Sequence, residues 1–253
     1  MTANHALSFP AMAPDKGRVI SFEAVDAAGK DTTADLVVSW LEKSGKTVFN
    51  FDTRGFADIP IETDVLRISE PGHWGIGKAI RGELMKDPGF DVRYIADAYA
   101  LDREALYRRV VLPFLSARPG RTVIQIRGLM SSLAYQTVQA EDQGVALGVP
   151  DLLELPGNKL ELTRRPDIIF LLVASEETLR KRQEGRSESM QKDIFGKREF
   201  QARVAKRYQA PDVQAPFLRL DTKIIKVSAE GEPEQVAARC IAHIVAHMPQ
   251  AAP

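Results

Sequence analysis

Short runs of β-branched and aromatic residues alternate along the chain with longer stretches whose apolar residues recur at helical spacing. Such runs occupy residues 18–23 (RVISFE), 47–51 (TVFNF), 122–126 (TVIQI), 167–173 (DIIFLLV) and 224–227 (IIKV). The third and fourth runs are continuous, which is typical of strands buried on both faces. Strands that alternate with helices predict an α/β fold with a parallel sheet of about five strands, covered by helices on both faces.

Helical spacing is clearest directly after the first strand. Apolar residues recur there from Leu36 to Leu41, and Ser44-Gly45 ends the pattern. A glycine at this place is typical of a left-handed helix end. Further helices are predicted at about 75–85, at 91–115, from 175 onward, through about 208 and at 233–247.

Composition limits the number of domains and the kinds of partner. The chain has 253 residues, of which 44% are hydrophobic, so we expect one domain at 18–248 between disordered tails at 1–17 and 249–253. The 34 basic and 34 acidic residues cancel, so no positive field indicates a nucleic acid partner. No apolar run or signal pattern predicts a membrane segment or secretion. The single Cys240 excludes an internal disulfide, and we expect a cytoplasmic protein.

Residues 23–36, EAVDAAGKDTTADL, nearly match the phosphate-binding loop pattern G-x-x-x-x-G-K-[ST]. Ala24 takes the place of the first glycine, and Asp31 that of the hydroxyl residue that binds magnesium. A strand precedes the loop and a helix begins near Lys30, so backbone N–H groups and the helix N-terminus can meet phosphates. An ordinary strand-to-helix turn containing Gly29 is the alternative interpretation.

Six segments, in order along the chain, are similar to motifs of the thymidylate kinase family. FEAVDAAGKDTT (22–33) resembles the family's F-E-G-x-D-G-x-G-K-x-T, and Glu70-Pro71-Gly72 with Ile80-Arg81 resembles R-E-P-G-G…I-R. The other four are ALDR (100–103) with Pro113, Arg127 with SSLAYQ (131–136), Pro166-Asp167 with Glu177, and Phe200 with Arg203-Val204 and Tyr208. They resemble A-x-D-R…P, D-R-Y-x-x-S-S-x-A-Y-Q, P-D-x-x-x-x-L-x-x-x-x-E and F-x-x-R-V-x-x-x-Y. The resemblance implies a three-layer P-loop NTPase fold.

The resemblance also implies the reaction and its site. The γ-phosphoryl group of ATP would pass to dTMP, with Mg²⁺ as cofactor, and such a transfer depends on positioning and charge neutralisation. The residues expected at ATP are Ala24, Val25, Asp26, Ala27, Ala28, Gly29, Lys30, Asp31 and Thr32. Those expected at the acceptor are Asp26, Glu70, Arg81, Tyr99, Arg103, Arg127, Ser132 and Tyr135. Those expected to act in catalysis are Lys30, Arg127, Asp26, Arg182 and Arg186.

Within the acceptor site the resemblance gives each side chain a part. Arg127 and Arg81 are expected at the phosphate and Tyr99 on the face of the base. Arg103 and Ser132 are expected at the edge of the base, Tyr135 near the sugar, and Asp26 around the sugar hydroxyl and the metal.

A basic segment at about 180–198 follows the fourth predicted strand, where a lid over ATP is expected. A closed lid would bring cationic groups to the transition state, and Arg182 and Arg186 are the candidates. A charged helix face exposed to solvent is the alternative interpretation of this segment.

Three departures from the family's motifs concern charge. Ile126 stands where D-R-Y has its aspartate, and because an apolar side chain cannot bind metal, Glu70 or Asp26 would have to substitute. Asp31 replaces a hydroxyl, yet magnesium accepts carboxylate oxygen readily. Asp31 and Glu70 are therefore the candidate metal ligands. Ser69 stands where an arginine precedes E-P-G, and Arg67 could compensate.

Three functions stay open on the sequence. The first is a dTMP kinase. The second performs the same reaction on another or a modified deoxypyrimidine monophosphate, because Ser69, His73 and Gly128 differ from the family's motifs. The third is a nucleotide-binding module with weakened catalysis, suggested by Ile126. The expected partners are small nucleotides, without nucleic acid or membrane, and the resemblance implies a homodimer.

Overall fold

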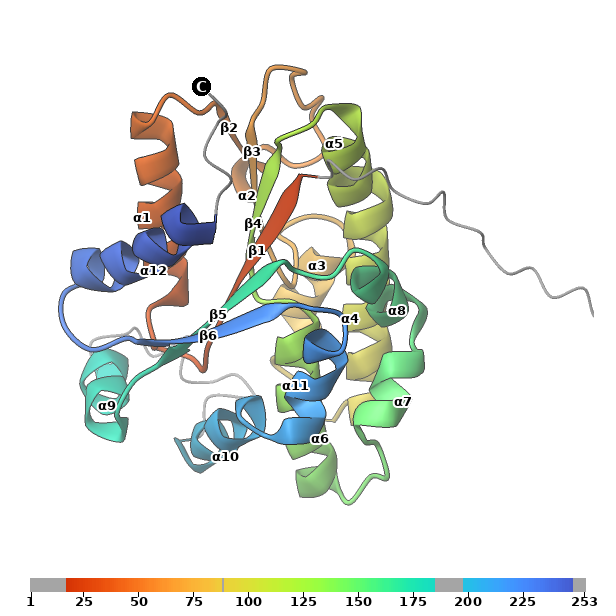
Figure 1. Ribbon diagram of the computed structural model, residues 1–253. Helices are drawn as coiled ribbons and strands as arrows, with labels where there is room; N and C mark the ends of the chain where they lie inside the picture. The colour runs from red at the N-terminus through yellow and green to blue at the C-terminus, as the bar shows by residue number, and fades with distance from the viewer. Residues whose placement is uncertain (1–16, 88, 185–197, 248–253) are drawn as a thin grey trace, which may run out of the picture.

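A computed structural model of the protein describes residues 17–87, 89–184 and 198–247. Its centre is a sheet of six parallel strands in the order β2-β3-β4-β1-β5-β6 (Figure 1). The strands are β1 (Arg18–Glu23), β2 (Val48–Asn50), β3 (Val65–Ser69), β4 (Thr122–Ile126), β5 (Ile168–Val173) and β6 (Lys223–Ser228). The predicted parallel α/β fold is confirmed. The expected tails, apart from Gly17, and the middle of the expected lid lie outside the described residues.

Strand β3 corrects the sequence-based prediction, which expected about five strands and none between residues 51 and 75. It lies between β2 and β4, with Arg67 opposite Asn50 on one side and Ile124 on the other. All five residues of VLRIS are buried. Arg67 interrupts the apolar pattern, and its charge is accommodated by two carboxylates described below. The sequence pattern therefore missed the sixth strand because its central residue is a buried arginine.

Helices cover both faces of the sheet (Figure 1). They are α1 (Lys30–Lys43), α2 (Phe51–Arg54), α3 (Ile76–Ala79), α4 (Val92–Leu106), α5 (Leu112–Ala117), α6 (Leu129–Gln143), α7 (Val149–Glu154), α8 (Pro156–Thr163), α9 (Glu176–Glu184), α10 (Arg198–Tyr208), α11 (Pro211–Leu218) and α12 (Pro233–His247). Two π-helical turns, η1 (Ile80–Leu84) and η2 (Tyr107–Val111), continue α3 and α4. None of the helices within the described ranges is both long and apolar enough to cross a membrane.

Side chains that alternate along β1, β3 and β4 belong to two core clusters. Ile20 of β1 belongs to a cluster that includes Val37 of α1 and Ile244 of α12. Its neighbour Val19 belongs to a second cluster, which includes Phe114 of α5. Successive residues of β1 point to opposite faces of the sheet, so each face of β1 packs against one of the clusters. The larger cluster reaches both faces, since it also contains the consecutive β5 residues Ile169, Phe170 and Leu171. The predicted three-layer arrangement follows from this alternation.

Because all strands are parallel, their carboxyl ends meet at one edge of the sheet. Phe22 of β1 lies opposite Ile126 of β4, which in turn lies opposite Ser69 of β3. Main-chain hydrogen bonds extend this register by one residue, since the N–H of Glu70 donates to Ile126 O and that of Arg127 to Phe22 O, each at 2.9 Å. The phosphate loop, Glu70 and Arg127 therefore emerge side by side, where α/β sheets bind ligands.

Gly157 gives a test of the packing between α8 and α4. A Cβ atom there would overlap the carbonyl oxygen of Ala100 and lie 3.0 Å from the backbone N of Glu104. Because backbone cannot move aside cheaply, we expect Gly157→Ala to lower the free energy of unfolding by about 3 kcal/mol in urea titrations. The control is Gly82→Ala, since a Cβ at Gly82 meets nothing within 4 Å. Equal stability of the two variants would contradict this packing.

Candidate active site

The loop between β1 and α1 has the backbone that the phosphate-binding pattern requires. Gly29, the residue before the helix, has φ of 89°, a left-handed conformation that favours glycine. Ala24 is absent from the positive-φ residues of the described chain, so alanine is tolerated at the position of the pattern's first glycine. No described side chain caps the start of α1. Its first N–H groups are therefore available to an anion.

Lys30, the first residue of α1, is held between two carboxylates. Its Nζ lies 3.7 Å from Asp26 Oδ1 and 3.4 Å from Asp31 Oδ2. Burial, reinforced by the nearby Arg127, lowers the pKa of Lys30, and the two carboxylates oppose that change. The two carboxylates thus hold the ammonium group at the phosphate loop, as expected of a residue that binds phosphate.

Arg127 joins the end of β4 to the phosphate loop. Its Nη2 donates to Asp26 Oδ1, and its Nη1 donates to Ala24 O at 3.2 Å and to Ser131 Oγ at 3.3 Å. The guanidinium also stacks on Tyr135, with 4.9 Å between its Cζ and the ring centroid. The structure therefore brings together Arg127, Asp26, Lys30 and Tyr135, four of the predicted site residues.

A second group of predicted residues forms a buried polar cluster. Arg103, 1% exposed, donates from Nη2 to Ser132 Oγ at 2.9 Å and pairs with Glu70 Oε2 at 2.7 Å and Glu161 Oε2 at 2.8 Å. Gln125 occupies the other oxygen of Glu70 at 3.1 Å. Burial raises the pKa of Glu70 well above its usual range and that of Glu161 to about 7, despite the Arg103 charge. With both oxygens engaged, Glu70 is poorly placed for a metal.

Arg81, the other predicted phosphate ligand, lies beyond the end of β3. Its Nε donates to Pro71 O at 2.8 Å and its Nη2 to Ser69 Oγ at 3.4 Å. Ser69 thus orients an arginine, although it replaces the arginine of the family's motif. Tyr99 is half-buried on α4 and near enough to influence the pKa of Arg81, which burial lowers. Arg81 is therefore held beside the segment that contains Glu70.

Arg67 is fully engaged by anions, which argues against the idea that it compensates for Ser69. Its Nη1 contacts Asp52 Oδ2, and its Nη2 lies 3.1 Å from Asp35 Oδ1 on α1. Asp52 Oδ1 also accepts from the N–H of Ser69 at 3.2 Å. Nothing in the sequence marked Asp35 and Asp52 as partners of the strand arginine, because the three lie far apart along the chain.

Arg182 lies on the other side of the loop, at the end of α9. Its Nη1 donates to Ala28 O at 3.2 Å and its Nη2 to Ala229 O at 2.9 Å. It therefore adjoins the loop that would hold ATP. Arg186 lies outside the described residues, as does segment 185–197 of the expected lid.

Packing explains the two motif departures at the carboxyl end of β4, Ile126 and Gly128. Ile126 is 1% exposed and belongs to the main core cluster. At Gly128 a Cβ atom would lie 2.5 Å from Gln125 Nε2 and 2.8 Å from Glu161 Oε1. The side chains of the buried cluster thus occupy the room that an aromatic residue would need.

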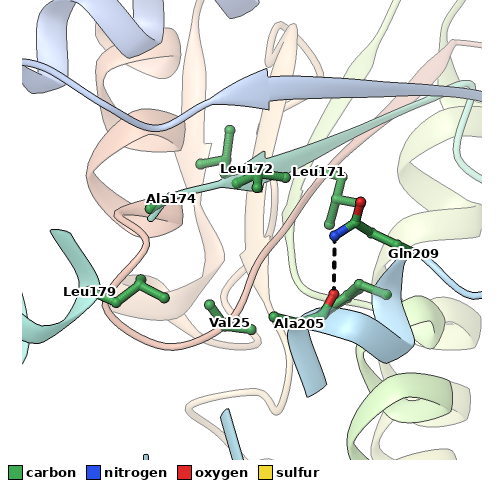
Figure 2. A pocket seen from close by; sticks show the side chains of 9 residues that line it. Val25, Leu171, Leu172, Ala174, Leu179, Ala205 and Gln209 are labelled. Atoms are coloured by element: carbon green, nitrogen blue, oxygen red, sulfur yellow. Dashed lines mark hydrogen bonds between the residues drawn. The ribbon is translucent and has the colours of Figure 1, made fainter. Parts of the chain in front are cut away.

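A small pocket beside the loop is too small and too apolar for a nucleotide (Figure 2). It has a volume of about 30 Å³, room for a water molecule or two. The labelled lining residues are Val25, Leu171, Leu172, Ala174, Leu179, Ala205 and Gln209, and the amide of Gln209 donates to the carbonyl of Ala205. The candidate site is therefore the polar edge around Lys30 and Arg127.

No motif marks Gln201, a residue of α10 that contacts the loop directly. Its amide oxygen accepts from the N–H of Asp26 and its amide nitrogen donates to Asp26 Oδ2, each at 3.0 Å. The family pattern F-x-x-R-V leaves this position unspecified. Only the folded chain places it against the loop.

The buried cluster predicts how stability depends on pH. The carboxyl of Glu161, whose pKa is raised in the folded state, retains a proton that the unfolded chain releases. The free energy of unfolding therefore falls as pH rises from 4.5 to about 7. Glu161→Gln removes this titration. Relative to the variant, the wild type should lose on the order of 1–3 kcal/mol between about pH 5 and about pH 8 in urea titrations. Exposed Glu154→Gln is the control, and parallel curves for wild type and Glu161→Gln would refute the prediction.

Comparison with known proteins agrees with this geometry. A sequence model of the thymidylate kinase family matches residues 60–239. A probable thymidylate kinase of Pyrococcus horikoshii is 30% identical over 172 residues, 66% of this chain and 70% of that protein. The thymidylate kinase of Prochlorococcus marinus is 29% identical over 87% of this chain and 92% of its own length.

The fold has the same counterpart among solved structures. Thymidylate kinase from Ehrlichia chaffeensis superposes with a TM-score of 0.61 at 20% identity, covering 90% of this chain and 99% of that one. The family match begins after the phosphate loop, so the loop itself is identified by its conformation and by the charged residues around it. The chain belongs to the thymidylate kinase family.

Proposed function

We propose that the protein is an ATP-dependent kinase that transfers the γ-phosphoryl group of ATP to dTMP, giving dTDP and ADP. The observation that carries the proposal is the convergence of Lys30, Asp26 and Arg127 at the carboxyl ends of β1 and β4. One cation belongs to the phosphate loop and the other to the neighbouring strand end. This arrangement supports two adjacent phosphate sites, and membership of the family supports the choice of nucleotides.

On the donor side, the residues from Ala24 to Thr32 would surround the ATP phosphates. The uncapped start of α1 supplies N–H groups, and Lys30 supplies the charge that reaches the outer phosphates. Arg182 adjoins the same loop through Ala28. Its place supports a donor-side role, in which it neutralises charge on the transferred group.

On the acceptor side, Arg127 and Arg81 would hold the monophosphate, with Tyr99 at the base and Tyr135 near the sugar. An oxygen of that phosphate attacks the γ-phosphorus of ATP, and the bond to the ADP oxygen breaks. No covalent intermediate with the protein is needed, so the side chains act by alignment and charge. Arg103 and Ser132 would support the acceptor site from the protein interior, because Arg103 is enclosed by Glu70 and Glu161.

Magnesium is the cofactor that such a transfer requires, and Asp31 fits it best. Its side chain is more than half exposed at the start of α1. Burial disfavours the ionised form, but Lys30 and Arg127 outweigh it and the pKa of Asp31 is lowered, so the carboxylate is ionised. Magnesium prefers such oxygen ligands and, when bound, neutralises charge on the phosphates. Ile126 offers no oxygen, and both oxygens of Glu70 are engaged.

The proposal extends to assembly and location. We expect a homodimer in the cytoplasm. The family supports the dimer, and the single buried Cys240 is compatible with a reducing compartment.

The decisive test is ADP release in a coupled assay over a panel of monophosphates. We expect the highest kcat/KM with dTMP, and a loss of at least about 100-fold in Lys30→Met because the loop loses its cation. Lys43→Met, at the exposed end of the same helix, should remain near wild type. Higher turnover with another deoxypyrimidine monophosphate would shift the acceptor, and no turnover with any acceptor would refute the kinase.

Asp31 is tested by the magnesium requirement. Asp31→Asn should raise the Mg²⁺ concentration for half-maximal activity by about tenfold, because an amide is a weaker ligand than a carboxylate. Asp35→Asn is the matched control, since Asp35 lies one turn further along α1 and is already paired with Arg67. An unchanged Mg²⁺ requirement in Asp31→Asn would remove Asp31 from the metal site.

A further inference from the structure

Helix α10 contacts the phosphate loop at both of its ends. Near its start, Gln201 binds the main chain and the carboxylate of Asp26. At its end, the hydroxyl of Tyr208 donates to Ala24 O at 3.3 Å and to Glu23 Oε2 at 3.2 Å. Residues seven apart lie on the same face of a helix, so one face of α10 presents both side chains to the loop.

We propose that Gln201 is a positioning residue, which sets the Asp26 carboxylate in the orientation that holds Lys30 and Arg127. The inference rests on the kinase function proposed above and extends it to a residue outside the family's motifs.

The contacts of Asp26 show what Gln201 controls. Asp26 Oδ1 receives Arg127 Nη2 and lies 3.7 Å from Lys30 Nζ, while Asp26 Oδ2 receives the amide of Gln201. Rotation of the carboxylate would break both sets of contacts together. Fixing Oδ2 therefore keeps Oδ1 toward the two cations.

An amide is suited to this task because it carries a donor and an acceptor in one plane. Gln201 uses its acceptor on the N–H of Asp26 and its donor on the carboxylate of the same residue. The side chain is 3% exposed, and Tyr135 donates a further hydrogen bond to its oxygen at 3.2 Å. A carboxylate at position 201 has no donor for Asp26, and an alanine has neither group.

Helix α10 is anchored independently of the loop, which lets it act as a fixed support. Arg203 donates to Glu141 Oε2 of α6 at 2.6 Å and contacts Asp142. Phe200 and Val204 are buried in the main core cluster. The phosphate loop can therefore change its conformation next to Gln201 while α10 stays packed against α6 and the core.

The test is the ratio of variant to wild-type kcat/KM with dTMP and ATP, measured across pH. Gln201→Ala should reduce kcat/KM by about tenfold at every pH, the effect of losing one hydrogen bond to a charged group. Gln201→Glu should show the same loss of kcat/KM at about pH 8, where the introduced carboxylate and that of Asp26 repel each other. At about pH 6, where the two carboxyl groups share a proton, its kcat/KM should recover toward the wild-type value.

The groups that decide where this recovery falls are Asp26, Lys30 and Arg127 on one side and Tyr135 on the other. Both variants see the same groups, so the pH dependence of Gln201→Glu relative to Gln201→Ala isolates position 201. Gln209→Glu is the matched control. Gln209 lies just after the same helix and is exposed, so its ratio should stay flat.

Hydrogen exchange gives a second measurement that does not depend on turnover. Gln201→Ala should speed exchange in the peptide containing residues 24–29, because the N–H of Asp26 loses its acceptor, while α10 keeps its protection. Normal activity and normal exchange in Gln201→Ala would overturn the proposal, as would a flat ratio for Gln201→Glu. If the wild type phosphorylates no monophosphate, the proposed function fails, and exchange still decides whether Gln201 positions Asp26.

Discussion

The ion pair between Arg127 and Asp26 is the contact on which the site depends. It joins residues 101 positions apart in the chain, one after β4 and one in the loop after β1. The parallel register of the two strands sets their separation, and Arg127 adds a hydrogen bond to Ala24 O. The loop that would hold one nucleotide and the cation that would hold the other are thus parts of one electrostatic unit.

Around that pair, the polar network has a partly solvent-exposed part and a buried part. Asp26 and Asp31 lie at the loop, partly open to solvent, and they flank the buried ammonium group of Lys30. Arg103, Glu70 and Glu161 lie beneath, where two carboxylates share one guanidinium and burial raises the pKa of both acids. Buried ion clusters are costly to desolvate but fix geometry strongly once formed. The buried cluster therefore supports the strand ends that carry the charged residues of the loop.

Much of the fold could be predicted because its signals are local. A continuous apolar run such as 167–173 predicts a buried strand, and Gly29-Lys30 between a strand and a helix predicts the phosphate loop. Strand β3 escaped because Arg67, its central residue, is buried only with the help of Asp35 and Asp52. That partnership has no local signature, so the pattern did not predict a strand.

The sequence by itself determined the parallel α/β fold, the place of the loop and the identity of its charged residues, because periodicity and motif spacing are properties of the chain. The tertiary structure decided which of those residues meet. It set Glu70 and Arg103 against Glu161 in the interior, left Asp31 exposed beside Lys30, and brought Gln201 of α10 onto Asp26. Hydrogen bonds and ion pairs act over a few ångströms in space, and only folding makes residues distant in the chain neighbours.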